Sequence, residues 1–285
     1  MKKYIHIICL IAAVSLLLQS CKKEKELVAS PAQVFYTLPQ GNQPYDQTFV
    51  KFQQDFGTYF LYKFSEDDFR WNGTSRLLFM AKNAEEANIQ EAYDFIKKAF
   101  LDDYTKEKLQ QLLPYKILLS AGVHQLTANL SKPTGFDTVA TNIGFYTGVN
   151  HVTFGYANST LSTLTPVRKL ELQANLHKSF FSYALSREKI AVPSAFSTPF
   201  NITGNSATAY KGLGFLEFVR SYTVSQDFAT YIYTALRYNK QQFTSLYLGS
   251  VQDPSGLIAT KYAIVQQYLL QEWNINTETI ANRAL

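Results

Sequence analysis

Cysteine is almost absent from this sequence of 285 residues: only Cys9 and Cys21 occur. The chain after Cys21 therefore offers no thiol for a disulfide, a cysteine-ligated metal or a cysteine nucleophile. It also lacks a second long apolar run, an internal repeat, a glycine-rich phosphate loop and a serine-centred nucleophile elbow. The body of the chain must therefore be stabilised by a packed core.

The chain also lacks a strong excess of positive or negative charge. The formal net charge is +5, and loss of Lys2 and Lys3 with the first twenty residues would leave +3. This balance gives no reason to expect a nucleic-acid partner. Aromatic residues are plentiful, with 19 Tyr and 21 Phe, which is compatible with sugar or peptide binding, although most of these rings are expected in the core.

The first twenty residues are organised like an export signal. Two lysines precede an apolar stretch over 4–18, and Ser20 stands directly before Cys21. The stretch of about 15 residues is shorter than the roughly 20 that a membrane-spanning helix needs, so a signal peptide is favoured over the alternative of a spanning anchor. We expect a signal peptide at 1–20, a lipidated N-terminus and tether at 21–44, and a single domain at 45–285.

The segment 18–21, Leu-Gln-Ser-Cys, resembles the bacterial lipobox. The resemblance implies a diacylglycerol on the sulfur of Cys21, cleavage before this residue and acylation of the new amino terminus. Two or three acyl chains give stable membrane anchoring, whereas one chain does not. The expected location is therefore the cell envelope, as an outer-membrane lipoprotein, with exposure at the cell surface left open.

The spacing of apolar residues predicts helices at both ends of the body and strands between them. Four phenylalanines in 49–60 recur at helical spacing, as do the apolar residues of 84–101. Strands are predicted at 115–120, 138–145 and 149–156, and further helices over 165–187, from Ser225 and from Asp253. This order favours an α+β fold, mainly helical with a small mid-chain sheet, over a doubly wound parallel sheet.

One polar pair stands out in the helix predicted over 165–187. Gln173 and His177 are four residues apart, which places them on one helical face, one turn apart. The motif His-Glu-x-x-His uses this spacing to bind one zinc ion with two imidazoles, beside a glutamate that acts as base. Here the sequence Gln-Ala-Asn-Leu-His stands in its place.

Several segments resemble the zinc-metallopeptidase-like lipoproteins known as substrate-import-associated zinc metallohydrolases. The similar segments lie at 56–64, 113–119, 148–151, 214–215 and 225–230, where Ser-Gln-Asp-Phe-Ala-Thr is similar to the family's Glu-Asp-Phe-Ala-Glu. The resemblance implies a zincin-like, more narrowly gluzincin-like, domain with a zinc ion. It also implies an accessory role beside a TonB-dependent outer-membrane complex that imports glycans or peptides.

The departures from this family predict a pseudoenzyme. Gln173 stands in place of the first histidine and Ala174 in place of the catalytic glutamate, while Gln226 and Thr230 replace carboxylates. His177 and Asp227 are the metal ligands that remain. Alanine cannot take a proton from water and an amide is a poor zinc ligand, so no catalytic residue is assigned and zinc affinity is expected to be weak.

Other interpretations stay open. His177 is equally compatible with a hydrogen-bonded core histidine, and Asp227 with a carboxylate that stabilises a helix N-terminus. His124 and His151 are isolated in the sequence. The alternative function is an active metal-dependent peptidase or hydrolase with a non-standard ligand set, in which Glu171 or Glu217 acts as base. A structural lipoprotein without a small ligand is a third option.

Overall fold

The computed structural model describes residues 36–70 and 78–285. Residues 1–37 and 38–285 form two separate units, and all of the elements described belong to the second. The expected signal peptide, Cys21 and most of the expected tether lie outside the described residues. Within the described ranges, no helix is both long enough and apolar enough to cross a membrane.

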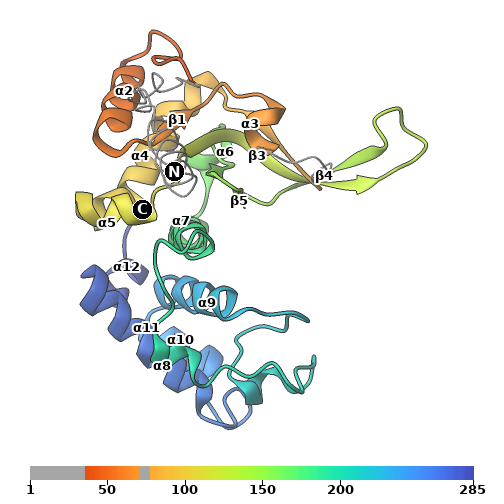
Figure 1. The fold of residues 1–285 in the computed structure, drawn as a ribbon, viewed down its shortest axis with the longest axis vertical. Coiled ribbons are helices and arrows are strands. Elements are labelled where there is room, and N and C mark those ends of the chain that lie inside the picture. Colours follow the sequence, from red (N-terminus) through yellow and green to blue (C-terminus); the bar gives the residue numbers. More distant parts are fainter. Residues whose placement is uncertain (1–35, 71–77) are drawn as a thin grey trace, which may run out of the picture. The chain divides into compact units, whose positions relative to one another are not determined.

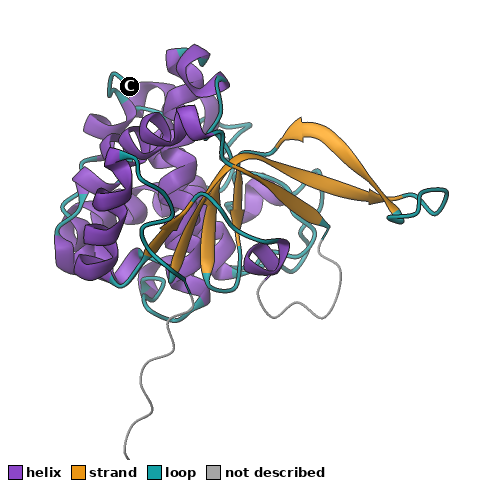
Figure 2. Cartoon of the chain, turned by 90° about the horizontal axis from the view of Figure 1, so that it is seen from above, coloured by secondary structure: helices purple, strands orange, loops and turns teal. Residues whose placement is uncertain are grey.

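A mixed sheet of six strands occupies the first half of the unit (Figure 1). Its strands are β1 (Tyr59–Leu61), β2 (Phe79–Asn83), β3 (Lys116–Ala128), β4 (Phe136–Asn142), β5 (Phe145–Thr147) and β6 (His151–Phe154). The first part of β3 lies between β1 and β6 and runs parallel to both, and β5 is antiparallel to β6 at the edge. The second part of β3 pairs with β2 and β4, both antiparallel, and extends away from the helices (Figure 2).

Helices precede and follow this sheet. They are α2 (Pro44–Phe56), α3 (Glu66–Arg70), α4 (Ile89–Ala99), α5 (Lys106–Leu112), α6 (Thr160–Thr163), α7 (Pro166–Ser186), α8 (Ser194–Ser197), α9 (Val224–Arg237), α10 (Lys240–Tyr247), α11 (Leu257–Trp273) and α12 (Thr277–Ala281). The predicted α+β class is confirmed. The sheet is larger than predicted, because β1 and β2 are too short to show a clear alternation in the sequence.

The helix predicted through 49–60 ends early. Gly57 adopts a left-handed conformation with φ of +70°, and its N–H donates to the carbonyl of Gln53, which closes α2 at Phe56. This backbone conformation favours glycine as the residue that follows a helix. Phe60 therefore lies in β1 and packs from there against Phe49 of α2, with their ring centroids 5.1 Å apart.

Helix α7 begins where the sequence predicts. The hydroxyl of Thr165 accepts a hydrogen bond from the backbone N–H of Arg168, and Pro166 is the first helical residue. Eleven side chains of this helix are buried, and α7 packs against both α9 and the sheet, as Figure 1 shows. The helix therefore joins the two halves of the core, and any site on it is held rigidly.

Candidate functional site

Gln173 and His177 do lie on one helix, α7, and both side chains are completely buried. The amide nitrogen Nε2 of Gln173 donates to the carbonyl oxygen of Ile280 in α12, at 2.9 Å. Ala174 beside it is also completely buried, within the main core. This part of α7 therefore contacts other core residues.

His177 belongs to a buried polar network. Its Nδ1 lies 2.6 Å from the hydroxyl oxygen of Tyr104, and its Nε2 lies 3.5 Å from Oδ2 of Asp103. Arg283, near the C-terminus, forms a two-pronged ion pair with the same Asp103. The aromatic ring of Phe100 packs edge-on against the imidazole. These contacts fit a histidine that links α7 to the C-terminal segment.

Asp227 lies in the first turn of α9 and is completely buried. Its Oδ2 accepts a hydrogen bond of 2.7 Å from Nζ of Lys261, on α11, and this lysine is also completely buried. Burial raises the pKa of Asp227 to about 6, although the charge and hydrogen bond of Lys261 act in the opposite direction. Asp227 and His177 therefore have different partners, and the structure does not bring these two predicted ligands together.

The isolated histidines are part of the sheet. His124 lies on β3, and its Nδ1 is 3.1 Å from the carbonyl oxygen of Val139. His151 begins β6 and is buried beside Lys116, its register partner on β3. Burial, followed by the charge of Lys116, lowers the pKa of His151 to about 3. Among the residues that the structure describes, neither histidine belongs to a group of side chains that could hold a metal ion.

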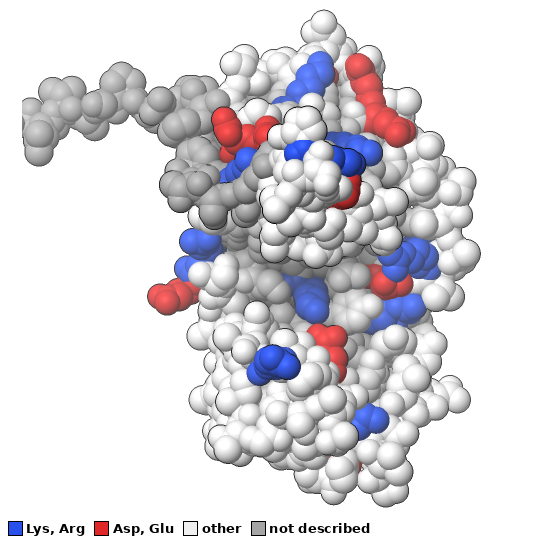
Figure 3. Space-filling model, turned by 90° about the vertical axis from the view of Figure 1, so that its right-hand side faces the viewer, with Lys and Arg blue, Asp and Glu red and all other residues white. Residues whose placement is uncertain are grey.

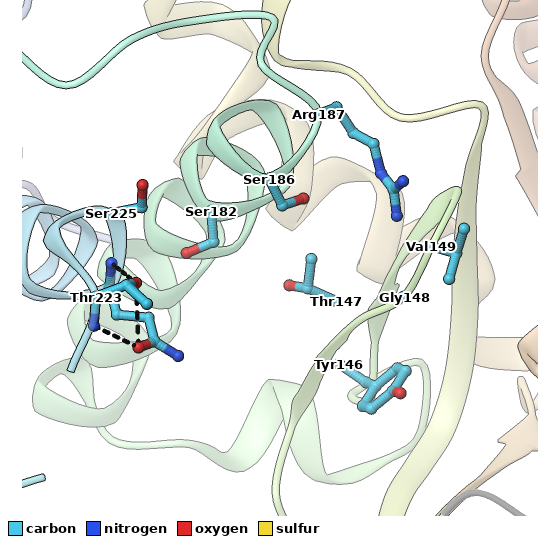
Figure 4. Close-up of a pocket in the computed structure, with 10 residues that line it drawn as sticks. Tyr146, Thr147, Gly148, Val149, Ser182, Ser186, Arg187, Thr223 and Ser225 are labelled. Atoms are coloured by element: carbon cyan, nitrogen blue, oxygen red, sulfur yellow. Dashed lines mark hydrogen bonds between the residues drawn. The ribbon is translucent and has the colours of Figure 1, made fainter. Parts of the chain in front are cut away.

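A cleft of about 600 Å³ lies between the sheet edge and the two packed helices. Strand β5 and the turn after it form one wall, and the C-terminal part of α7 and the start of α9 form the other (Figure 4). We call this the cleft, and it is lined by Tyr146, Thr147, Gly148, Val149, Ser182, Ser186, Arg187, Thr223, Ser225 and Gln226. None of these lining residues is acidic.

A smaller hollow of about 260 Å³ adjoins the cleft. We call it the inner pocket, and it is lined by Lys178, Ser182, Glu217, Val219, Tyr222, Gln226, Ala229 and Thr230. Ser182 and Gln226 line both spaces, so the two lie next to each other. Figure 3 shows one face of the molecule with a hollow that contains basic side chains next to an acidic one.

The cleft meets α7 on the side opposite to Gln173 and His177. Each residue turns an α-helix by about 100°, so two residues nine positions apart point in opposite directions. Gln173 and Ser182 are nine apart, as are His177 and Ser186, and the two serines are the members that line the cleft. The zinc-binding helix face that the sequence suggested is therefore the core-facing side of α7.

Two pairs of residues at the same four-residue spacing do face the inner pocket. Lys178 and Ser182 lie one turn apart on α7, and Gln226 and Thr230 lie one turn apart on α9. Of the residues singled out from the sequence, Gln226, Thr230 and the candidate base Glu217 are thus the ones that the structure brings together in a hollow. The polar positions 178, 182 and 186, which recur every four residues in the C-terminal half of α7, were the available sequence signal for this face.

Charges in the inner pocket are few. Burial lowers the pKa of Lys178, and Glu217 acts in the opposite direction. Nζ of Lys178 lies 5.5 Å from the centre of the Tyr233 ring. The hydroxyl of Tyr222 donates to Oε1 of Glu217 at 2.8 Å and lies 3.2 Å from Oγ1 of Thr230. Burial, with the negative charge of Glu217 as a further cause, raises the pKa of Tyr222.

The side chains that line the inner pocket do not fit the ligand set of a zinc ion. Zinc sites in proteins use imidazole, thiolate and carboxylate ligands, usually three or four of them. The two helices offer an ammonium, two hydroxyls and an amide to the inner pocket, and Glu217 adds one carboxylate. Across residues 36–70 and 78–285, no three His, Cys, Asp or Glu side chains are grouped so as to hold a metal ion.

Comparison with known proteins finds a likeness in fold. No protein-family model matches the sequence, and no curated protein matches it. The structure resembles the crystal structure of a protein from Bacteroides caccae described as a "putative zinc-binding metallo-peptidase". The TM-score is 0.53 with 14% sequence identity, over 83% of this chain and 88% of the other. The chain therefore shares its overall fold with that protein.

Proposed function

We propose that this chain is a non-catalytic lipoprotein with a degenerate zincin-like domain, and that it binds an extended peptide in the cleft. We further propose that it serves as an accessory protein to a TonB-dependent importer of the outer membrane. The alternative, a metal-dependent hydrolase with a non-standard ligand set, needs several metal ligands besides a base, and the inner pocket offers Glu217 as its one carboxylate.

The observation that carries this proposal is the set of side chains where α7 and α9 face each other. Hydrolysis by a metal-bound water needs ligands that hold the ion and a base that accepts the proton. Lys178 and Ser182 on one helix and Gln226 and Thr230 on the other supply neither. Glu217, the remaining candidate base, already accepts a hydrogen bond from Tyr222.

The edge of the sheet explains why we choose a peptide as the ligand. Along an antiparallel pair, the backbone groups of alternate residues point toward and away from the partner strand. The N–H of Gly148 donates to His151 and the carbonyl of Gly144 accepts from Gly155, so these residues face β6. Phe145 and Thr147, which alternate with them, therefore present their backbone groups outward, where an extended peptide can add as a further strand.

Support for the membrane and importer parts of the proposal comes from the sequence. The lipobox-like segment ending at Cys21 supports anchoring by lipid, and the similarity to importer-associated lipoproteins supports the accessory role. We expect Cys21→Ser to move the protein from the outer-membrane fraction to the soluble fraction. Membrane retention of the Cys21→Ser protein would contradict anchoring by lipid.

The binding experiment uses the mature protein and capped pentapeptides in calorimetric titrations. We expect binding that Thr147→Pro abolishes, because proline removes the outward N–H, while a proline at an edge position leaves the sheet intact. Thr147→Ala is the matched control and should bind normally. Binding of glycans with no binding of peptides would contradict the choice of ligand. Stoichiometric zinc together with chelator-sensitive peptide cleavage would contradict the non-catalytic assignment.

A further inference from the structure

We infer that the cleft selects peptides that carry a carboxylate, and that Arg187 is the residue that binds this group. The inference rests on the proposed binding of a peptide in the same cleft. It adds the chemical class of the ligand and names the residue that recognises it.

Arg187 directly follows α7 and is fixed by its backbone. Its N–H donates to the carbonyl of Tyr183 at 3.1 Å, which closes the last turn of the helix. From this position the side chain enters the cleft, and its guanidinium points toward Thr147, Gly148 and Val149, at the end of β5 (Figure 4). The guanidinium therefore lies next to the strand edge on which the peptide is proposed to bind.

The guanidinium of Arg187 makes no hydrogen bond or ion pair with the part of the chain that the structure describes. Two other arginines of the chain do have partners: Arg168 pairs with Glu171, and Arg283 pairs with Asp103. An arginine presents several N–H donors in a planar fork that matches a carboxylate with two parallel hydrogen bonds. Arg187 thus keeps its full donor set available to a ligand.

The rest of the cleft favours an anion. Its lining holds one cation and no acidic side chain. The other polar groups are an amide and hydroxyls, and the hydroxyl of Ser225 lies across the cleft from Arg187 in Figure 4. A negative charge bound here meets attraction from Arg187 and hydrogen-bond donors from the hydroxyls, without repulsion from the lining.

A peptide can supply the carboxylate from its C-terminus or from an Asp or Glu side chain. Two pairs of probes separate these sources. The first pair is acetylated pentaalanine with a free C-terminal acid and the same peptide with a C-terminal amide. The second pair has an amidated C-terminus and carries either Glu or Gln at its centre. Each pair differs by one carboxylate and in little else.

Calorimetric titration of the mature protein with these four peptides tests the inference. We expect at least one acid-bearing peptide to bind about 10- to 100-fold more tightly than its neutral partner, the range for a charge-assisted hydrogen bond of about 1.5–3 kcal/mol. Arg187→Gln should remove this preference, and Arg187→Lys should keep part of it. Lys98→Gln, an equal loss of charge at an exposed position of α4, should leave the preference unchanged.

The outcomes separate this inference from the proposed function. Equal binding of acidic and neutral peptides would overturn the inference and leave peptide binding intact. A preference for acids that survives in Arg187→Gln would overturn the role of Arg187. Failure of all four peptides to bind would overturn the proposed function and this inference together. Melting temperatures of the variants show whether each protein is folded, and an exposed side chain such as Arg187 can be replaced without opening the core.

Discussion

Nζ of Lys261 lies 2.7 Å from Oδ2 of Asp227, and neither side chain is accessible to solvent. The ammonium also donates to the carbonyl oxygen of Gly214 at 3.2 Å and lies 4.7 Å from the centre of the Phe215 ring. Lys261 thus connects α11, the start of α9 and the loop that ends at Gly214. A carboxylate that the sequence suggested as a metal ligand is held by a buried lysine.

Breaking this pair should destabilise the fold strongly. Lys261→Met leaves the carboxylate of Asp227 buried without a partner, and we expect the free energy of unfolding to fall by about 3–5 kcal/mol. The double variant Lys261→Met with Asp227→Leu removes both charges and should recover much of this loss. Urea denaturation of the three proteins measures the effect. A double variant as unstable as Lys261→Met would contradict the explanation.

The histidine at the start of β6 should make the fold sensitive to acid. Burial lowers the pKa of His151 to about 3, whereas the ordinary value is near 6.5, so the folded protein holds this imidazole neutral. The unfolded chain therefore binds a proton that the folded chain does not bind between these two pH values. The stability from this group is present above pH 6.5 and decreases as the pH falls toward 3, by up to about 1.4 kcal/mol per pH unit.

The measurement is the free energy of unfolding at pH 7 and at pH 4.5. We expect a smaller decrease on acidification in His151→Gln than in the natural protein, because glutamine does not titrate. His124→Gln, a change to the other histidine of the sheet, is the control and should retain the full decrease. An equal decrease in His151→Gln and the natural protein would show that other groups are responsible.

Two sets of substitutions test which face of α7 has the geometry of a metal site. Lys178→His, Ser182→His and Gln226→Glu together place two imidazoles and a carboxylate on the inner pocket. This variant should bind one zinc ion per chain, because the four-residue spacing on one helix suits two imidazoles on one metal. Calorimetric titration with zinc and elemental analysis of the dialysed protein measure the binding.

The contrasting variant carries Gln173→His and Ala174→Glu, about one turn before Lys178 on α7. Both positions are completely buried, so the new glutamate has no room and no partner there. We expect no gain in bound zinc and a lower melting temperature, because burial of an unpaired charge is strongly unfavourable. If this variant bound zinc and the inner-pocket variant did not, the result would support the metal site that the sequence suggested.

The hydroxyl of Tyr104 should stabilise the fold through His177. Tyr104→Phe leaves Nδ1 of His177 buried without its 2.6 Å partner, and we expect a loss of about 1–2 kcal/mol in the free energy of unfolding. Tyr93→Phe is the control, since the Tyr93 hydroxyl makes no hydrogen bond to the described residues. Peptide binding should be the same in both variants. If Tyr104→Phe lost peptide binding and Tyr93→Phe did not, His177 would be shown to contribute to peptide binding.

Local signals in the sequence were sufficient to predict several helix boundaries. Thr165 and Pro166 start α7 as expected, because capping and proline geometry depend on neighbouring residues. Asp253 was expected to begin a helix, but α11 begins later, at Leu257, and the carboxylate of Asp253 accepts the N–H groups of Ile258 and Ala259 in its first turn. The end of α2 at Gly57 was missed, because the apolar spacing continues unchanged into β1.

The candidate site was less predictable than the fold. The spacing of Gln173 and His177 defines a helical face but does not say whether that face meets a cleft or the core. Contacts with Ile280 and Tyr104, both more than 70 positions away, decide it. Arg187 gave no motif at all, since its position beside β5 depends on how α7 packs against the sheet.

The amino-acid sequence by itself determined the local features of this protein: a segment before Cys21 that resembles an export signal, the caps of its helices, and a chain after Cys21 that carries no thiol. These features depend on neighbours only a few positions apart, so they can be derived without a fold. The tertiary structure alone decided that Asp227 pairs with Lys261 and that Ser182 faces the cleft, opposite to Gln173. Such contacts join residues far apart in the chain, and they exist only after the helices and the sheet have packed.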